Sequence, residues 1–210
     1  MKIDRIFYIN LDDHNDRRKD MENEFAKMDI ISHNLPNPDN KLTYERFSAI
    51  KHDTIGVGRG NSHIKVLKIA KERNYSTIII FEDDFVFTVS KEDFYHQLGS
   101  LDGIYMDACI LSGNVISYNN STLTRNIYRL IQSRITSGYL INCRYNDTLI
   151  SCFQTAMENL ERTNNHLHYA IDVAWNILQA TDPWYALKIM IGRQREIHSD
   201  YTNKTLSHNN

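Results

Sequence analysis

The sequence predicts a single α/β domain with a mostly parallel central β-sheet flanked by helices. Strand-like and helix-like segments alternate through the first half of the chain, as they do when helices connect parallel strands. The segment 77–81 (TIIIF) is apolar at every position after Thr77, which is typical of a strand covered on both faces. No repeat, linker or shift in composition divides the 210 residues, a length that suits one domain.

The elements of the first half follow from the spacing of apolar residues. Residues 3–11 (IDRIFYINL) are rich in β-forming side chains and predict a buried first strand. Apolar residues at i, i+4 and i+7 over 21–28 predict an amphipathic helix, which an acidic turn precedes. A short strand is expected at 30–31 and another at about 44–50.

The glycine-rich segment 56–62 (GVGRGNS) is predicted to be a flexible loop that ends in helix-capping residues. A helix with a broad apolar face follows through Ile64, Leu67 and Ala70. The strand at 77–81 then ends abruptly in three consecutive carboxylates.

The second half has weaker signals. In order, it predicts a strand at 108–111, a polar loop at 112–126, a strand at 139–141, a helix over 149–160, a shorter helix at 171–179, a last strand at 184–191, and a polar, frayed tail over 201–210.

Composition excludes several classes of protein. With 41% hydrophobic residues the chain can bury a core, and a formal charge of −2 argues against a nucleic-acid partner. No apolar run approaches the roughly 18 residues of a membrane span. The first residues turn acidic before a signal-peptide core could form, and the three cysteines lack metal-ligand spacing. We therefore expect a cytoplasmic protein with ordinary buried thiols and no transmembrane segment.

The triplet Glu82-Asp83-Asp84 is the most informative segment for function. Like charges this close disfavour full ionisation, and a hard divalent cation would relieve their repulsion. Strand geometry places Glu82 and Asp84 on one side and Asp83 on the other. Open α/β sheets bind ligands at the carboxyl ends of their strands. A cation site is therefore favoured over an acidic turn that caps the next element.

Other segments leave alternatives open. The glycine-rich loop could present backbone N–H groups to a phosphate, with Glu82 about twenty residues downstream as in a dinucleotide-binding fingerprint. However, the segment before this loop is polar and the third glycine of the pattern is Asn61. His166, His168 and Asp172 could form a metal cluster, although their spacing fits no strong zinc pattern. Asp172 could equally cap a helix.

Taken in order, motifs spread over residues 3–200 resemble glycosyltransferase family 25, the lipopolysaccharide and collagen galactosyltransferase type. These motifs are Ile9-Asn10-Leu11-Asp12 with Arg17-Arg18, Ser62-His63, Phe81-Glu82-Asp83-Asp84-Phe85, Ser137-Gly138-Tyr139-Leu140-Ile141, Ile171-Asp172, and Gln194 with Ser199-Asp200. The chain departs from the family at Asn61, where a cysteine or a small apolar residue is usual.

The resemblance implies a GT-A-like fold with a Rossmann-like nucleotide-binding half. It also implies a nucleotide-diphosphate sugar donor (a UDP-sugar), a glycan or glycoprotein acceptor, Mn²⁺ or Mg²⁺, and inversion at the anomeric carbon. By position in the motifs, Asp172 would be the catalytic base and the metal ligands would be Glu82, Asp84 and His198. The donor-binding residues would be Asn10, Leu11, Arg17, Arg59, Ser62, His63 and Asp83.

Two other functions compete with this one. The glycine-rich loop would suit an NAD(P)-dependent oxidoreductase. A sugar-nucleotide or glycan-binding module without catalysis would keep the same pocket and lose the chemistry.

Overall fold

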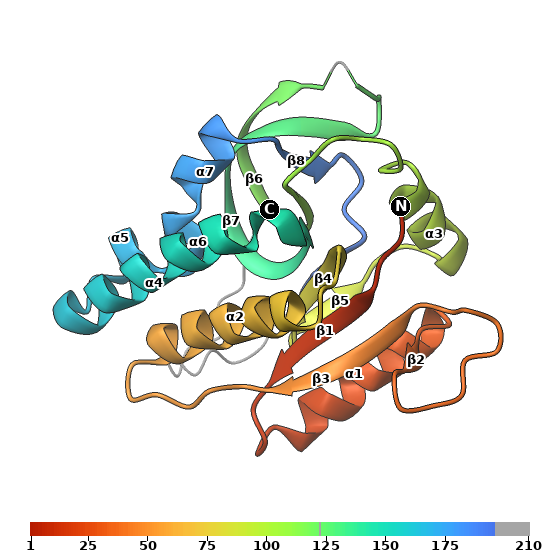
Figure 1. Cartoon of the computed structure of the whole chain (residues 1–210), viewed down its shortest axis with the longest axis horizontal. Coiled ribbons are helices and arrows are strands. Elements are labelled where there is room, and N and C mark those ends of the chain that lie inside the picture. The colour runs from red at the N-terminus through yellow and green to blue at the C-terminus, as the bar shows by residue number, and fades with distance from the viewer. Residues whose placement is uncertain (122, 196–210) are drawn as a thin grey trace.

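A computed structural model describes residues 1–121 and 123–195 of the chain (Figure 1). The strands are β1 (Arg5–Asn10), β2 (Ile31–Ser32), β3 (Thr43–Ser48), β4 (Thr77–Glu82), β5 (Phe85–Phe87), β6 (Ala108–Asn120), β7 (Ile127–Asn142), β8 (Trp184–Leu187) and β9 (Gly192–Gln194). The helices are α1 (Asn15–Lys27), α2 (Ile55–Glu72), α3 (Lys91–Gly99), the 3₁₀ helix η1 (Cys143–Tyr145), α4 (Asn146–Thr163), α5 (His166–Tyr169), α6 (Ile171–Ala174) and α7 (Asn176–Thr181).

A seven-stranded sheet with the order β2-β3-β1-β4-β7-β6-β8 forms the centre of the molecule. Strands β2, β3, β1 and β4 are parallel to one another, whereas β7 is antiparallel to β4, β6 and β8. The predicted α/β class is confirmed. Because β1, β3 and β4 run in one direction, their carboxyl ends meet at one edge of the sheet.

Helices cover both faces of this sheet (Figure 1). Alternate residues of β1 show the division: Phe7 and Ile9 pack with the apolar sides of α2 and α4, and Ile6 and Tyr8 pack with those of α1 and α3. Every residue of β4 is buried, as the unbroken apolar run predicts.

The predicted polar loop at 112–126 is wrong over most of its length. Strand β6 continues to Asn120 and pairs with β7, which begins at Ile127. Backbone pairing with β7 makes this segment a strand although its side chains are mostly polar. The predicted strand at 184–191 is shorter, because β8 ends at Leu187 and β9 pairs separately with β5.

The predicted glycine-rich loop is also wrong, because helix α2 begins at Ile55 and includes the glycines. These glycines permit close packing. A Cβ on Gly58 would lie 2.6 Å from the carbonyl oxygen of Ile50, and one on Gly60 would overlap the side chain of Met157 on α4. The spacing that suggests a phosphate loop is therefore a helix-packing pattern.

The remaining helices fall close to their predictions. Helix α1 covers the segment predicted at 21–28 except its last residue, and α4 contains the segment predicted at 149–160. Helices α6 and α7 replace the single helix predicted at 171–179. Helix α3 and strands β5 and β9 are not predicted from the sequence. Within the described residues, no helix is both long enough and apolar enough to cross a bilayer.

Candidate functional site

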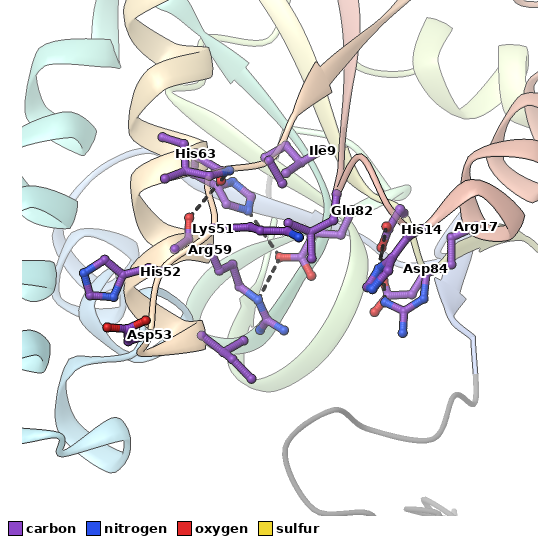
Figure 2. Close-up of a pocket in the computed structure, with 17 residues that line it drawn as sticks. Ile9, His14, Arg17, Lys51, His52, Asp53, Arg59, His63, Glu82 and Asp84 are labelled. Atoms are coloured by element: carbon purple, nitrogen blue, oxygen red, sulfur yellow. Dashed lines mark hydrogen bonds and ion pairs between the residues drawn. The ribbon is translucent and has the colours of Figure 1, made fainter.

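A pocket of about 500 Å³ opens where the carboxyl ends of β1, β3 and β4 meet the first turns of α2 (Figure 2). This volume and position are typical of small-molecule sites in α/β proteins. The residues that line it are Ile9, Leu11, His14, Arg17, Ala49, Ile50, Lys51, His52, Asp53, Ile55, Gly58, Arg59, Ser62, His63, Glu82, Asp83 and Asp84.

The loop after β1 is tied to Asp83 on one side of the pocket. The side chain of Asn10 donates to Asp83 Oδ2 over 2.8 Å and accepts from Arg46 on β3 over 2.9 Å. Arg17, in the first turns of α1, lies 3.5 Å from Asp83 Oδ1. Asn10 is itself buried and does not line the pocket. It therefore holds the end of β1 against Asp83, next to Leu11, which lines the pocket.

The opposite wall is the segment between β3 and α2. Ser62 Oγ donates to the carbonyl of Gly58 and accepts from the N–H of Ile50, both over 2.8 Å. The hydroxyl of Ser62 thus fastens this wall to α2. The Lys51 ammonium lies 2.8 Å from Asp13 across the pocket mouth. The wall residues 49–53 belong to no recognised motif, and the sequence analysis does not include them in the site. Their position after a parallel strand is the one feature of the sequence that could have indicated them.

Glu82, at the end of β4, accepts hydrogen bonds within the protein. His63 Nε2 lies 3.2 Å from Glu82 Oε1, and the hydroxyl of Thr136 donates to the same oxygen. Arg59 Nε lies 3.8 Å from it (Figure 2). Burial raises the pKa of Glu82, but the charge of Arg59 and the hydrogen bonds from His63 and Thr136 outweigh it. The pKa falls below its ordinary value, so Glu82 is an ionised carboxylate.

Asp84 has a different environment. Gln194 Nε2 donates to Asp84 Oδ2 over 2.6 Å, whereas Oδ1 is buried with no hydrogen-bond partner among the described residues. Burial, followed by the charge of Glu82, raises the pKa of Asp84 well above its usual range. Asp84 is 8% exposed and faces the pocket (Figure 2). A buried carboxylate oxygen that lacks a donor is a place where a cation fits.

Most of the predicted site residues meet at this pocket. Eight of them line it: Leu11, Arg17, Arg59, Ser62, His63, Glu82, Asp83 and Asp84. Asp172 is not among the lining residues. Its Oδ2 accepts from the N–H of Ile135 over 3.2 Å, next to the Thr136 that contacts Glu82. Its alternative role as a helix cap is wrong, because α6 begins at Ile171 without a side-chain cap. His198 lies outside the described residues.

No metal cluster is complete within residues 1–121 and 123–195. Over these ranges, no group of three or more His, Cys, Asp or Glu residues is arranged around one point. The alternative cluster of His166, His168 and Asp172 is therefore wrong. Glu82 and Asp84 offer carboxylates beside each other, and a cation there would take further ligands from a bound phosphate or water.

No protein-family model and no curated protein sequence matches the chain. Among solved structures, the chain is similar to a mannose-1-phosphate geranyltransferase from Thermus thermophilus, with 8% identity and a TM-score of 0.49 over 93% of this chain and 75% of that one. It is similar to a 4-diphosphocytidyl-2C-methyl-D-erythritol synthase from Anaerococcus prevotii, with 10% identity and a TM-score of 0.42 over 90% and 72%. It is also similar to the glycosyltransferase GlyE of Streptococcus pneumoniae, with 9% identity and a TM-score of 0.47 over 89% of this chain and 45% of that one.

Proposed function

We propose that this protein transfers a sugar from a nucleotide-diphosphate sugar to a hydroxyl of a glycan or glycoprotein acceptor, with inversion at the anomeric carbon. A UDP-sugar is the first donor to test, and Mn²⁺ or Mg²⁺ the first cation. The family resemblance of the sequence motifs suggests this reaction. The observation that carries it is the buried Oδ1 of Asp84, which has no hydrogen-bond partner among the described residues, in a pocket that Arg17, Lys51 and Arg59 also line.

The charges of the pocket suit a diphosphate. Arg17, Lys51 and Arg59 line it together with the carboxylates at the end of β4. Guanidinium and ammonium groups bind phosphate oxygens through charge-assisted hydrogen bonds. Asp84 would hold the cation, with the negative potential of Glu82 in support and His198 as a further predicted ligand. When bound, the cation supplies positive charge that neutralises the departing diphosphate.

The apolar and polar walls suit the nucleoside. Leu11 and Ile50 border the pocket on the two loops that follow β1 and β3. A planar base between such side chains would bury its apolar faces away from water. Arg17 and Lys51 line the same pocket and could bind the phosphates. In this arrangement Asn10 and Asp83 hold the β1 loop in place through their 2.8 Å hydrogen bond.

Inverting transfer needs one base on the face opposite the leaving diphosphate. We propose Asp172 for this role. Its carboxylate is anchored through Oδ2 to the backbone of Ile135, adjacent to the Thr136 that holds Glu82. The acceptor hydroxyl would lose its proton to Asp172 as its oxygen bonds to the anomeric carbon and the sugar–phosphate bond breaks.

A thermal-shift screen of nucleotide sugars, with and without Mn²⁺, tests the proposal. We expect one donor to raise the melting temperature only when the cation is present. The same screen with NADH and NADPH tests the oxidoreductase alternative, which has lost its main support because residues 56–62 are helical. Donor binding without transfer to any of a broad panel of acceptors would favour the non-catalytic binding module.

A further inference from the structure

A chain of buried polar groups ends on one oxygen of Glu82. The ring of His63 is fully buried, with Nδ1 2.9 Å from the hydroxyl of Tyr139 and Nε2 3.2 Å from Glu82 Oε1. Burial raises the pKa of Tyr139 well above its ordinary value, so its hydroxyl keeps its proton. A neutral His63 with its proton on Nε2 satisfies both contacts: Tyr139 donates to Nδ1, and Nε2–H donates to Glu82.

The internal contacts fall on the same side of the Glu82 carboxylate. His63, the hydroxyl of Thr136 and the Arg59 guanidinium all approach Oε1. No hydrogen bond among the described residues falls on Oε2, although Glu82 lines the pocket. The carboxylate is thus fixed in orientation, with one oxygen engaged inside the protein and the other left for a bound molecule (Figure 2).

Glu82 and Asp84 therefore differ in how well each can bind a cation. The contacts with Arg59, His63 and Thr136 already compensate the charge of Glu82, which weakens it as a cation ligand. Asp84 receives one hydrogen bond from Gln194, and its other oxygen is buried with no partner in residues 1–121 and 123–195. A fixed, compensated carboxylate is better suited to accept a hydrogen bond from a neutral hydroxyl.

We infer that Glu82 determines sugar specificity: its Oε2 accepts a hydrogen bond from a hydroxyl of the transferred sugar, and His63 and Tyr139 are positioning residues for it. The inference rests on the proposed function. In that function the sugar lies between the diphosphate at Asp84 and the base at Asp172. Glu82 lines the pocket two residues before Asp84, and it is bonded to Thr136, whose neighbour Ile135 contacts Asp172.

Calorimetric titration in the presence of Mn²⁺ distinguishes sugar recognition by Glu82 from cation binding. The ligands are a nucleoside diphosphate and its hexosyl conjugates, in the uridine and guanosine series. The measured quantity is the sugar increment, defined as the affinity for the conjugate divided by the affinity for the free diphosphate. In Glu82→Gln, the amide oxygen can still accept from His63 and Thr136, but an NH₂ donor replaces Oε2. We expect the sugar increment to fall about 10- to 100-fold while the affinity for the free diphosphate stays within about twofold.

Tyr139→Phe tests the positioning role without touching the pocket. It leaves Nδ1 of His63 without its donor, and we expect the sugar increment to fall by about 3- to 10-fold with diphosphate affinity unchanged. Tyr145→Phe is the matched control, because the hydroxyl of Tyr145 bonds Asp182 and lies away from the pocket. It should leave the sugar increment unaltered.

Three results would overturn the inference. An equal loss of affinity for diphosphate and conjugate in Glu82→Gln would make Glu82 a cation ligand. An unchanged sugar increment in both Glu82→Gln and Tyr139→Phe would mean that the contacts among Tyr139, His63 and Glu82 have a structural role only. A wild-type protein that binds the diphosphate without any sugar increment would refute sugar recognition by Glu82. If the wild-type protein binds neither ligand, the proposed function itself fails.

Discussion

Gln194 donates a 2.6 Å hydrogen bond to Oδ2 of Asp84 from 110 residues further along the chain. The short ribbon of β5 and β9 makes this contact, since Phe85, the residue after Asp84, pairs with Gln194. Outside contacts tie the ribbon down: Glu24 on α1 accepts from the N–H of Phe87 over 3.0 Å, and Arg195 pairs with Asp20 on the same helix. The ribbon thus fixes one oxygen of Asp84, and the other has no hydrogen-bond donor within the part of the chain that the structure describes.

We predict that Asp84→Asn stabilises the metal-free protein while abolishing cation-dependent donor binding. Because the folded-state pKa of Asp84 is raised, folding penalises its ionised form, and stability is lost as the pH rises above the ordinary carboxyl pKa of about 4. The variant should gain about 1–2 kcal/mol at pH 8 and little at pH 4. Urea unfolding with chelator at both pH values measures this gain. An equal gain at the two pH values, or retained Mn²⁺-dependent donor binding, would contradict the assignment.

We predict that Arg17→Ala weakens binding of the nucleoside diphosphate about tenfold, because a charge-assisted contact to a phosphate is lost. The loss should shrink with added salt. Arg18→Ala is the matched control, since Arg18 pairs with Glu22 one turn along the same helix and does not line the pocket. Titration calorimetry at low and high salt compares the two variants. Equal losses would mean that α1 attracts the ligand only through its overall charge.

The sequence predicts the parallel half of the fold well and the antiparallel half poorly, for a physical reason. Strand β4 is buried on both faces, so its composition alone marks it. The outer half of β6 is largely exposed and polar, and only its pairing with β7 makes it a strand. The glycines of α2 were misread because the contact that requires Gly60 comes from Met157, far away in the chain.

In the site, too, the features that a local sequence pattern encodes could be predicted, and those that depend on distant contacts could not. The acidic triplet was found because it ends a buried strand, and the place of that strand in the sheet fixes where the pocket lies. The separate environments of Glu82 and Asp84 depend on Thr136 and Gln194, which come from distant strands. No local pattern encodes such contacts, so the roles of Glu82 and Asp84 could not be separated from the sequence.

We predict that Gly58→Ala destabilises the protein by about 1–3 kcal/mol, because the added Cβ would lie 2.6 Å from the backbone oxygen of Ile50. The displaced wall should also weaken nucleotide binding, since Ile50 lines the pocket. Gly99→Ala is the control: it is exposed at the end of α3, a Cβ there meets nothing within 4 Å, and the helix should gain up to about 1 kcal/mol. Thermal unfolding and calorimetry measure both variants. A stable Gly58→Ala protein with full affinity would show that this contact is not needed.

We predict that Asp172→Asn lowers turnover by about 10²- to 10⁴-fold while donor affinity and the melting temperature stay close to those of the wild-type protein. Asparagine keeps an oxygen that can accept from the N–H of Ile135, so the anchor seen at 3.2 Å survives while the proton acceptor is lost. The measurement pairs turnover, with an acceptor found by screening, with calorimetric donor affinity. A variant that loses both affinity and melting temperature would assign Asp172 to holding the bend of β7 at Ile135. That backbone has a positive φ of 72°, which a β-branched residue rarely adopts without support. Full turnover would instead exclude Asp172 as the base and direct the search to the other carboxylates of the pocket.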